Sequence, residues 1–355
     1  MSLADHLAAR IQADGPMSVA AYMADCLLHP QYGYYTTRDP LGAKGDFITA
    51  PEISQMFGEL IGLALAQCWL DQGAPAPFTL AELGPGRGTL MADLLRATRG
   101  VPGFHAAMQL CLVEASPELR KSQAKTLEAY APEWLDHADA LPDQPLFLVA
   151  NEFFDALPIR QFIRSGDHWS EKRIGLTDGA LAFGLSPAAP QPALDHRLQD
   201  TQEGDLVEIC DAAAPATQAI AARIATHGGA ALIADYGDWR ALGDTLQALR
   251  AHEPADPLQA PGEADLTAHV DFEALAMAAK SKGCAYTRLT PQGVFLERLG
   301  ITDRARALAA PLQGDRLKTL IAAHRRLTHP EEMGNLFKIL GLYPSQAAPP
   351  PGLNP

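Results

Sequence analysis

A glycine-rich turn near residue 84 is the first place where residue types and spacing indicate a chemistry. Gly84, Gly86 and Gly88 follow the apolar stretch 78–83 and precede a helical pattern. Glycine lets a ligand approach the backbone where any side chain would clash, so the turn predicts a nucleotide-like ligand. The dinucleotide fingerprint needs its third glycine where this chain has Thr89. The spacing therefore disfavours a dinucleotide-dependent dehydrogenase.

Two acidic residues narrow the class of ligand. Glu82 precedes the turn. There it would repel a pyrophosphate but attract the ammonium and sulfonium groups of S-adenosylmethionine. Glu114 ends the next predicted strand, where nucleoside-binding folds place an acid that accepts hydrogen bonds from ribose hydroxyls. Taken alone, Glu114 also fits a helix-entry carboxylate, and Asp136 or Asp139 is a weak candidate for contact with the adenine. Together the residues predict S-adenosylmethionine as the cofactor.

The segment 151–158, Asn-Glu-Phe-Phe-Asp-Ala-Leu-Pro, follows another predicted strand. In open parallel sheets the ligand crevice lies beyond the carboxyl ends of the strands, so this segment should lie beside the transferred methyl group. If the acceptor were an arginine, Glu152 and Asp155 would grip and orient its guanidinium, and Asn151 would contact the cofactor. Phe153 and Phe154 would stack on the acceptor or exclude water. The alternative is that the phenylalanines are core residues and the two acids cap a following helix.

Two further polar segments are candidates for the site. In the segment 265–272, His269 would assist deprotonation of the acceptor or hydrogen-bond a carboxylate, although a lone histidine is more often structural. Asp271 fits a helix N-cap. The glycine-punctuated loop 42–49 is long enough to reach a ligand, and the alternative is a surface connection.

Strands and helices alternate after residue 78, which predicts an α/β fold with a doubly wound, Rossmann-like sheet. Strands are expected at 78–83, 110–114, 146–151, 230–235, 285–289 and 336–340, and helices at 89–98, 117–130, 214–226 and 271–282. Residues 1–75 lack strand alternation and should form a helical N-terminal cap, with helices at 18–28 and 51–69. A catalytic domain should cover 76–345, with a β-rich insertion at about 160–207 and a second insertion at about 238–270. The proline-rich tail 346–355 should be flexible.

Composition and charge disfavour several functional classes. The 355 residues are 47% hydrophobic, enough for a large core, and carry a formal net charge of −14, which argues against nucleic acid as a partner. No apolar run is long enough for a membrane span, and the N-terminus fits neither a secretory nor a transit peptide, so we expect a cytoplasmic location. The five cysteines are scattered and no histidine cluster is present, so we expect reduced core thiols and no metal site. A homodimer is compatible with this composition, but no heptad or exposed stripe establishes one.

Five segments in this order resemble the MidA family of S-adenosylmethionine-dependent methyltransferases: residues 33–35, 45–55, 83–90, 151–158 and 262–272. The resemblance spans nearly the whole chain and implies a seven-stranded methyltransferase fold. It also implies that the loop 45–49 closes over the donor, which adds Asp46 and Thr49 to the candidate cofactor-binding residues Glu82, Gly84, Gly86, Gly88, Glu114 and Asn151. Analogy with arginine methyltransferases implies that Glu152, Asp155 and His269 are the catalytic candidates.

The family's mitochondrial members are protein-arginine methyltransferases that modify a core subunit of respiratory complex I. The resemblance therefore implies an arginine-bearing protein substrate. Two alternatives remain open at this point. One is an assembly chaperone that keeps the fold without relying on catalysis. The other is a methyltransferase for a small metabolite, favoured if the inserted segments close the acceptor crevice.

Overall fold

The central feature of the fold is a mainly parallel sheet. The computed structural model describes residues 2–37, 49–250 and 253–355. Within them the sheet has the order β15-β17-β10-β5-β2-β3-β4, with β14 paired to β10 and β16 to β17. The run from β10 to β4 is parallel, whereas β17 and β15 are antiparallel to their neighbours. The strands are β2 (Phe78–Leu83), β3 (Met108–Val113), β4 (Glu133–Leu135), β5 (Leu146–Asn151), β10 (Gly229–Asp238), β14 (Val270–Asp271), β15 (Cys284–Tyr286), β16 (Thr290–Pro291) and β17 (Phe337–Pro344).

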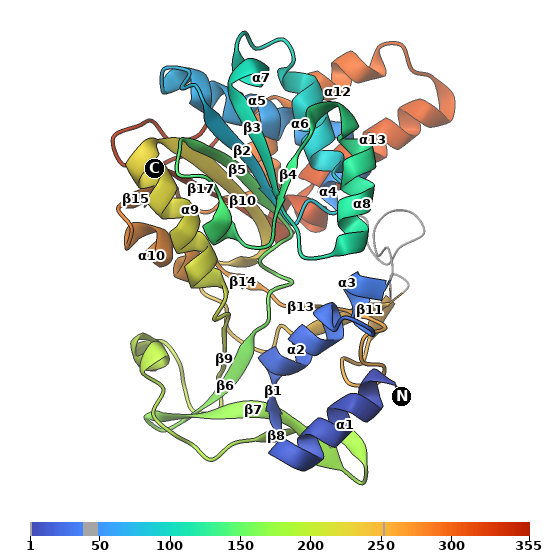
Figure 1. The fold of residues 1–355 in the computed structure, drawn as a ribbon, viewed down its shortest axis with the longest axis vertical. Helices are drawn as coiled ribbons and strands as arrows, with labels where there is room; N and C mark the ends of the chain where they lie inside the picture. The colour runs from blue at the N-terminus through green and yellow to red at the C-terminus, as the bar shows by residue number, and fades with distance from the viewer. Residues whose placement is uncertain (1, 38–48, 251–252) are drawn as a thin grey trace.

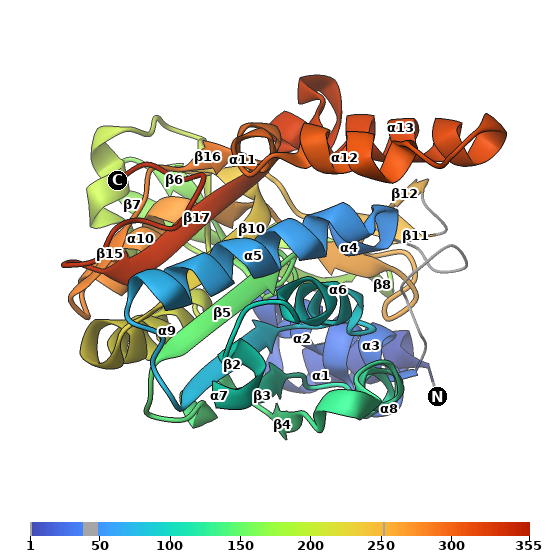
Figure 2. The same ribbon diagram turned by 90° about the horizontal axis from the view of Figure 1, so that it is seen from above.

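Helices cover both faces of this sheet because its inner strands are apolar on both sides. Along β2, Phe78 and Leu80 point into one hydrophobic cluster, whereas Ala81 and Leu83 point into the other. The first cluster includes residues of α5 and α6, and the second includes residues of α9 and α10. Figure 2 shows α5 lying along β5 and β10. These helices are α5 (Gln55–Asp71), α6 (Thr89–Thr98), α9 (Ala213–His227) and α10 (Phe272–Lys280).

The N-terminal cap is helical, as expected, with two differences. Its helices are α1 (Leu3–Asp14), α2 (Val19–Leu28), α3 (Tyr34–Thr37) and α4 (Ala50–Ile53). The helix expected over 51–69 is divided between α4 and α5, because Ser54 is extended and its hydroxyl caps α5. The cap also contains one short strand that the sequence analysis does not include, since β1 (Met17–Ser18) pairs with β7 of the first insertion.

Both insertions fold as small antiparallel sheets below the central sheet in Figure 1. The first contains β6 (Arg160–Ser165), β7 (His168–Thr177), β8 (Ala180–Leu185), the 3-10 helix η3 (Pro192–Gln199) and β9 (Leu206–Ile209). The second contains β11 (Gln247–Arg250), β12 (Glu253–Ala255) and β13 (Asp265–Thr267). The β-rich character expected for residues 160–207 is confirmed.

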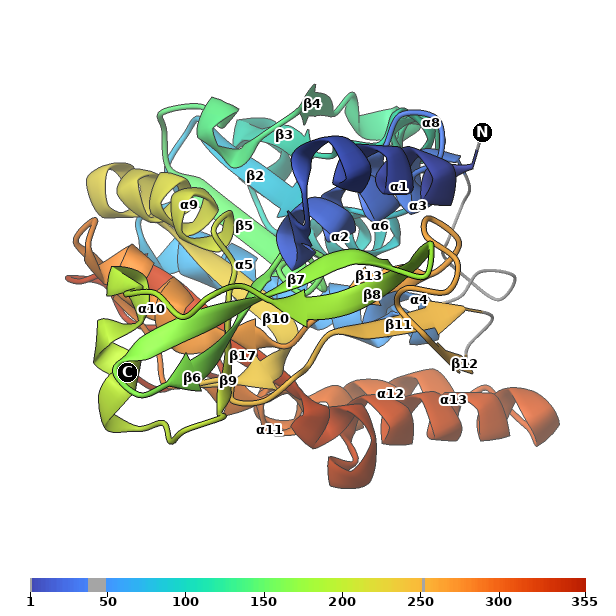
Figure 3. The same ribbon diagram turned by 90° about the horizontal axis from the view of Figure 1, so that it is seen from below.

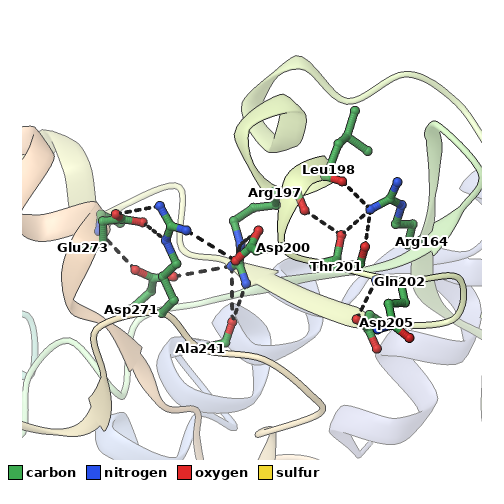
Figure 4. A network of polar contacts seen from close by, with 12 residues as sticks. Arg164, Arg197, Leu198, Asp200, Thr201, Gln202, Asp205, Ala241, Asp271 and Glu273 are labelled. Carbon is green, nitrogen blue, oxygen red and sulfur yellow. Dashed lines mark hydrogen bonds and ion pairs between the residues drawn. The ribbon is translucent and has the colours of Figure 1, made fainter.

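A buried arginine joins the first insertion to the central domain (Figure 4). Arg197 of η3 is 2% exposed, donates to both carboxylate oxygens of Asp200 at 3.1 Å, and donates to the Ala241 carbonyl at 3.2 Å. Arg240, two residues after β10, pairs with Glu273 of α10 and also donates to Asp200 of the insertion at 3.5 Å. These contacts fix the insertion against the end of β10, where the candidate site lies.

The C-terminal part contains three helices that the sequence analysis does not include. They are α11 (Gln292–Arg298), α12 (Ile301–Ala309) and α13 (Gly314–Thr328). Figures 2 and 3 show α12 and α13 extending beyond the edge of the sheet. Glu59 of α5 is 5% exposed and accepts hydrogen bonds from Arg96 of α6 and Arg304 of α12. This buried carboxylate therefore attaches α12 to the helices that cover the sheet.

Several shorter elements complete the fold, and one expected helix is shorter than predicted. The helix expected over 117–130 ends earlier as α8 (Pro117–Thr126), and the 3-10 turn η1 (Glu128–Tyr130) follows it. Asp271 caps α10 by accepting the Ala274 N–H at 3.1 Å, as expected. The remaining short elements are α7 (Phe104–Ala107), η2 (Ala138–Ala140) and the π-helical turn η4 (Pro330–Gly334).

The expectation of a flexible tail is wrong. Leu353 is only 6% exposed and belongs to the same hydrophobic cluster as Ile339 and Phe295, and the Asn354 carbonyl accepts the Arg288 N–H at 2.9 Å. The cysteines are free thiols, all buried except the half-buried Cys210. Across the described ranges, no helix combines the length and apolarity needed to cross a membrane.

Replacing Leu353 by alanine should lower the free energy of unfolding by about 2–4 kcal/mol, because the change leaves a cavity in a packed cluster. Leu336→Ala is the matched control, since Leu336 is 50% exposed, and it should change stability by less than about 0.5 kcal/mol. Chemical denaturation measures both. Equal stability of the two variants would contradict the packing of the tail.

Candidate active site

A cavity of about 590 Å³ lies between the carboxyl ends of the parallel strands and the N-terminal cap. Its lining residues come mainly from α2, α3 and α4 of the cap, from the turns after β2, β3, β4 and β5, and from parts of α9, β10 and β13. This volume is in the range of small-molecule sites. The fold thus brings the glycine turn and the segment 151–158 together, as the sequence analysis expects.

The glycine turn has a backbone that requires glycine. Gly84, Gly86 and Gly88 have φ angles of 58°, 54° and 81°, which are left-handed conformations that side chains disfavour. A Cβ atom on Gly84 would also lie 3.0 Å from Cδ2 of Phe153. Gly84 and Gly86 line the cavity with their backbone, whereas Gly88 faces Leu127 and Gln123 and is the N-cap of α6.

Glu82 lines the cavity as a buried carboxylate with incomplete hydrogen bonding. It is 3% exposed, and its Oε2 atom has no hydrogen-bond partner among the residues that the structure describes. Burial, followed by the charge of Glu114, raises the pKa of Glu82 to about 8. A cation in the cavity would stabilise the ionised form.

Glu114 lies directly after β3 and is held in place by two donors. Its Oε1 accepts the Ser116 N–H at 2.8 Å, and its Oε2 accepts from Nε2 of Gln123 at 3.0 Å. Burial raises the pKa of Glu114. The alternative of an ordinary helix-entry carboxylate is disfavoured, because Ser116 caps α8 and Glu114 lines the cavity.

The turn after β5 carries the candidate acceptor-binding residues. Glu152 has a φ of 51°, and its Oε1 accepts from Nδ2 of Asn151 at 3.0 Å and from the Ala50 N–H at 3.3 Å. Burial, followed by the charge of Asp155, raises the pKa of Glu152 to about 7, and burial raises that of Asp155. No helix begins within residues 152–158, so Glu152 and Asp155 are not helix caps. Phe154 is a core residue at 3% exposure, whereas Phe153 lines the cavity.

Asp235, which the sequence analysis did not assign to the site, fixes this turn. It is fully buried at the end of β10, and its Oδ2 accepts the N–H groups of Phe154 at 3.0 Å and Asp155 at 3.3 Å. Its Oδ1 accepts the Tyr236 N–H at 3.0 Å. Burial, followed by the charges of Asp155 and Glu152, raises the pKa of Asp235 well above its usual range. One carboxylate therefore binds three backbone donors around the acceptor turn.

His269 is not among the residues that line the cavity. Its ring packs edge-on against Tyr236 with centroids 5.4 Å apart, and its backbone N–H donates to Thr245 Oγ1 at 2.8 Å. Burial lowers the pKa of His269, so the neutral form is favoured at physiological pH. Tyr236 itself lines the cavity, and it lowers the pKa of Asp155 against the larger opposing effect of burial.

Thr49 lines the cavity beside Glu52, which accepts a hydrogen bond from Thr89 Oγ1 at 2.6 Å. Asp46 lies outside the described residues. Tyr35, another residue not assigned from the sequence, donates its hydroxyl to both carboxylate oxygens of Asp265 at 2.9 Å. The sequence signal for Tyr35 is the aromatic cluster 32–35. The sequence alone does not show its partner, because Asp265 comes near only when the fold places β13 beside the cap.

Comparison with known proteins assigns the fold and cavity to a family. A model of the family described as "putative S-adenosyl-L-methionine-dependent methyltransferase" matches residues 60–290, more than half of the chain. The chain belongs to the MidA family of methyltransferases. A Burkholderia thailandensis protein solved with bound S-adenosyl-homocysteine superposes on this MidA protein with a TM-score of 0.83 and 31% identity, over 96% of this chain and 91% of that chain.

Two curated relatives of this MidA protein are mitochondrial proteins named protein arginine methyltransferase NDUFAF7. The Danio rerio relative is 37% identical over 96% of this chain and 86% of its own length. The Homo sapiens relative is 36% identical over 96% of this chain and 83% of its own length. The chain is an S-adenosylmethionine-dependent methyltransferase. The Glu82 oxygen that has no partner among the described residues, and the backbone of Gly84 and Gly86 in the cavity wall, fit this cofactor.

Asp235→Asn should lower kcat by about tenfold or more while changing the Kd of S-adenosylhomocysteine by less than about twofold. The amide would set an N–H donor against backbone donors and displace the turn that carries Glu152. Asp238→Asn, at the exposed end of the same strand, is the control and should leave kcat unchanged. Methyl transfer and titration calorimetry measure the two quantities. An unchanged kcat in folded Asp235→Asn would contradict the assigned role.

Proposed function

We propose that this MidA protein transfers a methyl group from S-adenosylmethionine to an arginine nitrogen of a protein partner. The observation that carries the proposal is the chemistry of the turn after β5. Asn151 Oδ1 and Asp155 Oδ1 are buried there without hydrogen-bond partners among the described residues, and all three side chains from Asn151, Glu152 and Asp155 line the cavity. These atoms are acceptors. A guanidinium presents only N–H donors in a planar fork, which complements them.

The charge of the cavity also supports a cationic acceptor. Its acidic lining residues are Glu52, Glu82, Glu114, Asp136, Asp139, Glu152, Asp155 and Asp265. Among the described lining residues, Arg87 is the permanently charged cation. The methyl donor has an ammonium, a sulfonium and a carboxylate, so its small net positive charge cannot offset these acids. Buried carboxylates require pairing, and a guanidinium would supply it.

The same reasoning from charge and hydrogen bonding indicates which residues of the cavity would bind the methyl donor. Glu82 would pair with the methionyl ammonium, and Glu114 would accept hydrogen bonds from the ribose hydroxyls. Gly84 and Gly86 would let the donor lie against the backbone, and Gly88 would shape the turn as the N-cap of α6. Thr49 and Asn151 would complete the contacts with the donor. When bound, the cofactor supplies a methyl group on a sulfonium, a leaving group that becomes a neutral thioether.

In the acceptor half, Glu152 and Asp155 would hold the guanidinium in one orientation and accept a proton. Methylation of a cationic guanidinium leaves a cationic product, so one N–H proton must be released. Burial raises the pKa values of both carboxyls, which places them nearer to neutral pH and suits them to this exchange. Positioning and electrostatic stabilisation would supply most of the rate enhancement. His269 would act indirectly, through its contact with Tyr236.

The proposed partner is a core subunit of respiratory complex I, in keeping with the family resemblance and with relatives named protein arginine methyltransferases. The net charge of −14 supports a partner that presents a basic segment rather than nucleic acid.

The test is incubation of the protein with S-adenosylmethionine and purified complex I core subunits, followed by peptide mass spectrometry. We expect added methyl mass on an arginine. Glu152→Gln should lower the rate by about two orders of magnitude or more with little change in donor affinity, because it removes both the anion and the proton acceptor. Glu331→Gln, whose side chain is 84% exposed, is the matched control and should behave as wild type.

The outcomes separate the proposal from its alternatives. Methyl transfer to a metabolite but to no arginine would identify a small-molecule methyltransferase and contradict the proposal. Complex I assembly supported equally by wild type, Glu152→Gln and a Gly84→Val variant that does not bind donor would identify a chaperone.

The affinity for S-adenosylhomocysteine should be greatest near pH 8. Below the Glu82 pKa of about 8, the carboxyl must lose a proton before it pairs with the ligand ammonium; above that pH, the ligand amine loses its own charge. Binding should therefore weaken by up to about tenfold between roughly pH 8 and pH 6.5. Glu82→Gln should bind weakly, with little dependence on pH in this range. Titration calorimetry at each pH measures the effect, and a wild-type affinity that does not change across it would contradict the role of Glu82.

A further inference from the structure

Gln123 is a fully buried polar side chain that contacts both the glycine turn and Glu114 in the donor-binding region. It lies on α8 and is 0% exposed. Its Nε2 donates to the Gly86 carbonyl at 2.8 Å and to Glu114 Oε2 at 3.0 Å, and its Oε1 accepts from Trp134 Nε1 at 2.8 Å. A buried amide with both donors and its carbonyl engaged is held rigidly.

The orientation of this amide is determined by its partners. The indole nitrogen of Trp134 is a donor only, so it must face the amide oxygen of Gln123. The Gly86 carbonyl and the Glu114 carboxylate are acceptors, so both must face the amide nitrogen. A flipped amide would oppose donor to donor and acceptor to acceptor. Trp134, on β4, thus sets the direction in which Gln123 donates.

Two consequences follow for the cavity. The Glu114 carboxylate is held between Gln123 on Oε2 and the Ser116 N–H on Oε1, so it cannot rotate freely. These donors also stabilise its ionised form, against the burial that raises its pKa. The Gly86 carbonyl is drawn toward α8, so the following peptide N–H points to the opposite side of the same planar unit.

We propose that Gln123 is a positioning residue for the donor, which orients the Glu114 carboxylate toward the ribose hydroxyls and aligns the glycine turn. This inference rests on the role proposed above for Glu114. It extends the donor site to Gln123 of α8 and Trp134 of β4, which do not line the cavity and would act on the donor through Glu114 and Gly86.

The test compares S-adenosylhomocysteine with its 2′-deoxyribose analogue by titration calorimetry. Wild type should prefer the ribose form by about tenfold or more, because a hydrogen bond to a carboxylate is lost in the analogue. Gln123→Leu should weaken binding of S-adenosylhomocysteine by about tenfold or more and reduce the preference to within about twofold. A change in the preference distinguishes positioning of Glu114 from a general loss of stability, which would weaken both ligands alike.

Two further variants keep the test decisive. Trp134→Phe removes the donor that fixes the amide, so it should lower the preference at least threefold even if Gln123→Leu does not fold. Gln109→Leu changes an exposed glutamine on β3 and should bind both ligands as wild type does. Circular dichroism and thermal melting establish that each variant is folded.

Each result has a definite meaning. A wild-type preference that persists in Gln123→Leu, or in Trp134→Phe where Gln123→Leu does not fold, would overturn the inference and leave the role of Glu114 intact. Equal weakening of both ligands would also overturn it. No preference in wild type would refute the proposed ribose contact of Glu114, and the role of Gln123 with it.

Discussion

Buried negative charge is the constraint on which the rest of this structure depends. Glu82, Glu114, Glu152 and Asp155 line one cavity, and burial raises the pKa of each. Desolvated carboxylates are stable only when hydrogen bonds or cations offset their lost hydration. The protein supplies some of these bonds from its own N–H groups, and among the described residues one oxygen each of Glu82 and Asp155 has no hydrogen-bond partner. The site is therefore prepared for positively charged ligands before they arrive.

Two layers of the fold enclose the cavity: the parallel sheet lies on one side, and the cap with β13 lies on the other. The parallel sheet brings the ends of β2, β3 and β5 together and carries the donor and acceptor turns on rigid elements. The cap and β13 of the second insertion form the opposite wall, where Tyr35 of the cap bonds Asp265 of β13. Asp235 lies on β10, next to β5, and it holds the acceptor turn in place by accepting the N–H groups of Phe154 and Asp155. Rigid supports of this kind hold reacting groups in place.

The features predictable from sequence are those that local patterns encode. The glycine turn, Glu82 and Glu114 follow from a strand–turn–helix pattern, and the central strands follow from apolar runs. The role of Asp235 was not predictable, because its partners lie some 80 residues away along the chain. Composition also misled at the tail, where proline suggests disorder but Leu353 packs into the core. His269 was assigned from its type, whereas its placement beside Tyr236 is set by tertiary packing.

The most direct measurement is a crystal structure of the protein with S-adenosylhomocysteine and an arginine-containing peptide from its partner. We predict that the guanidinium nitrogens lie within hydrogen-bonding distance of Glu152 and Asp155, with one nitrogen directed at the sulfur of the bound donor product. A peptide bound elsewhere, or a guanidinium in the cavity that contacts neither carboxylate, would contradict the claim that the buried acids of the β5 turn select and orient the methyl acceptor.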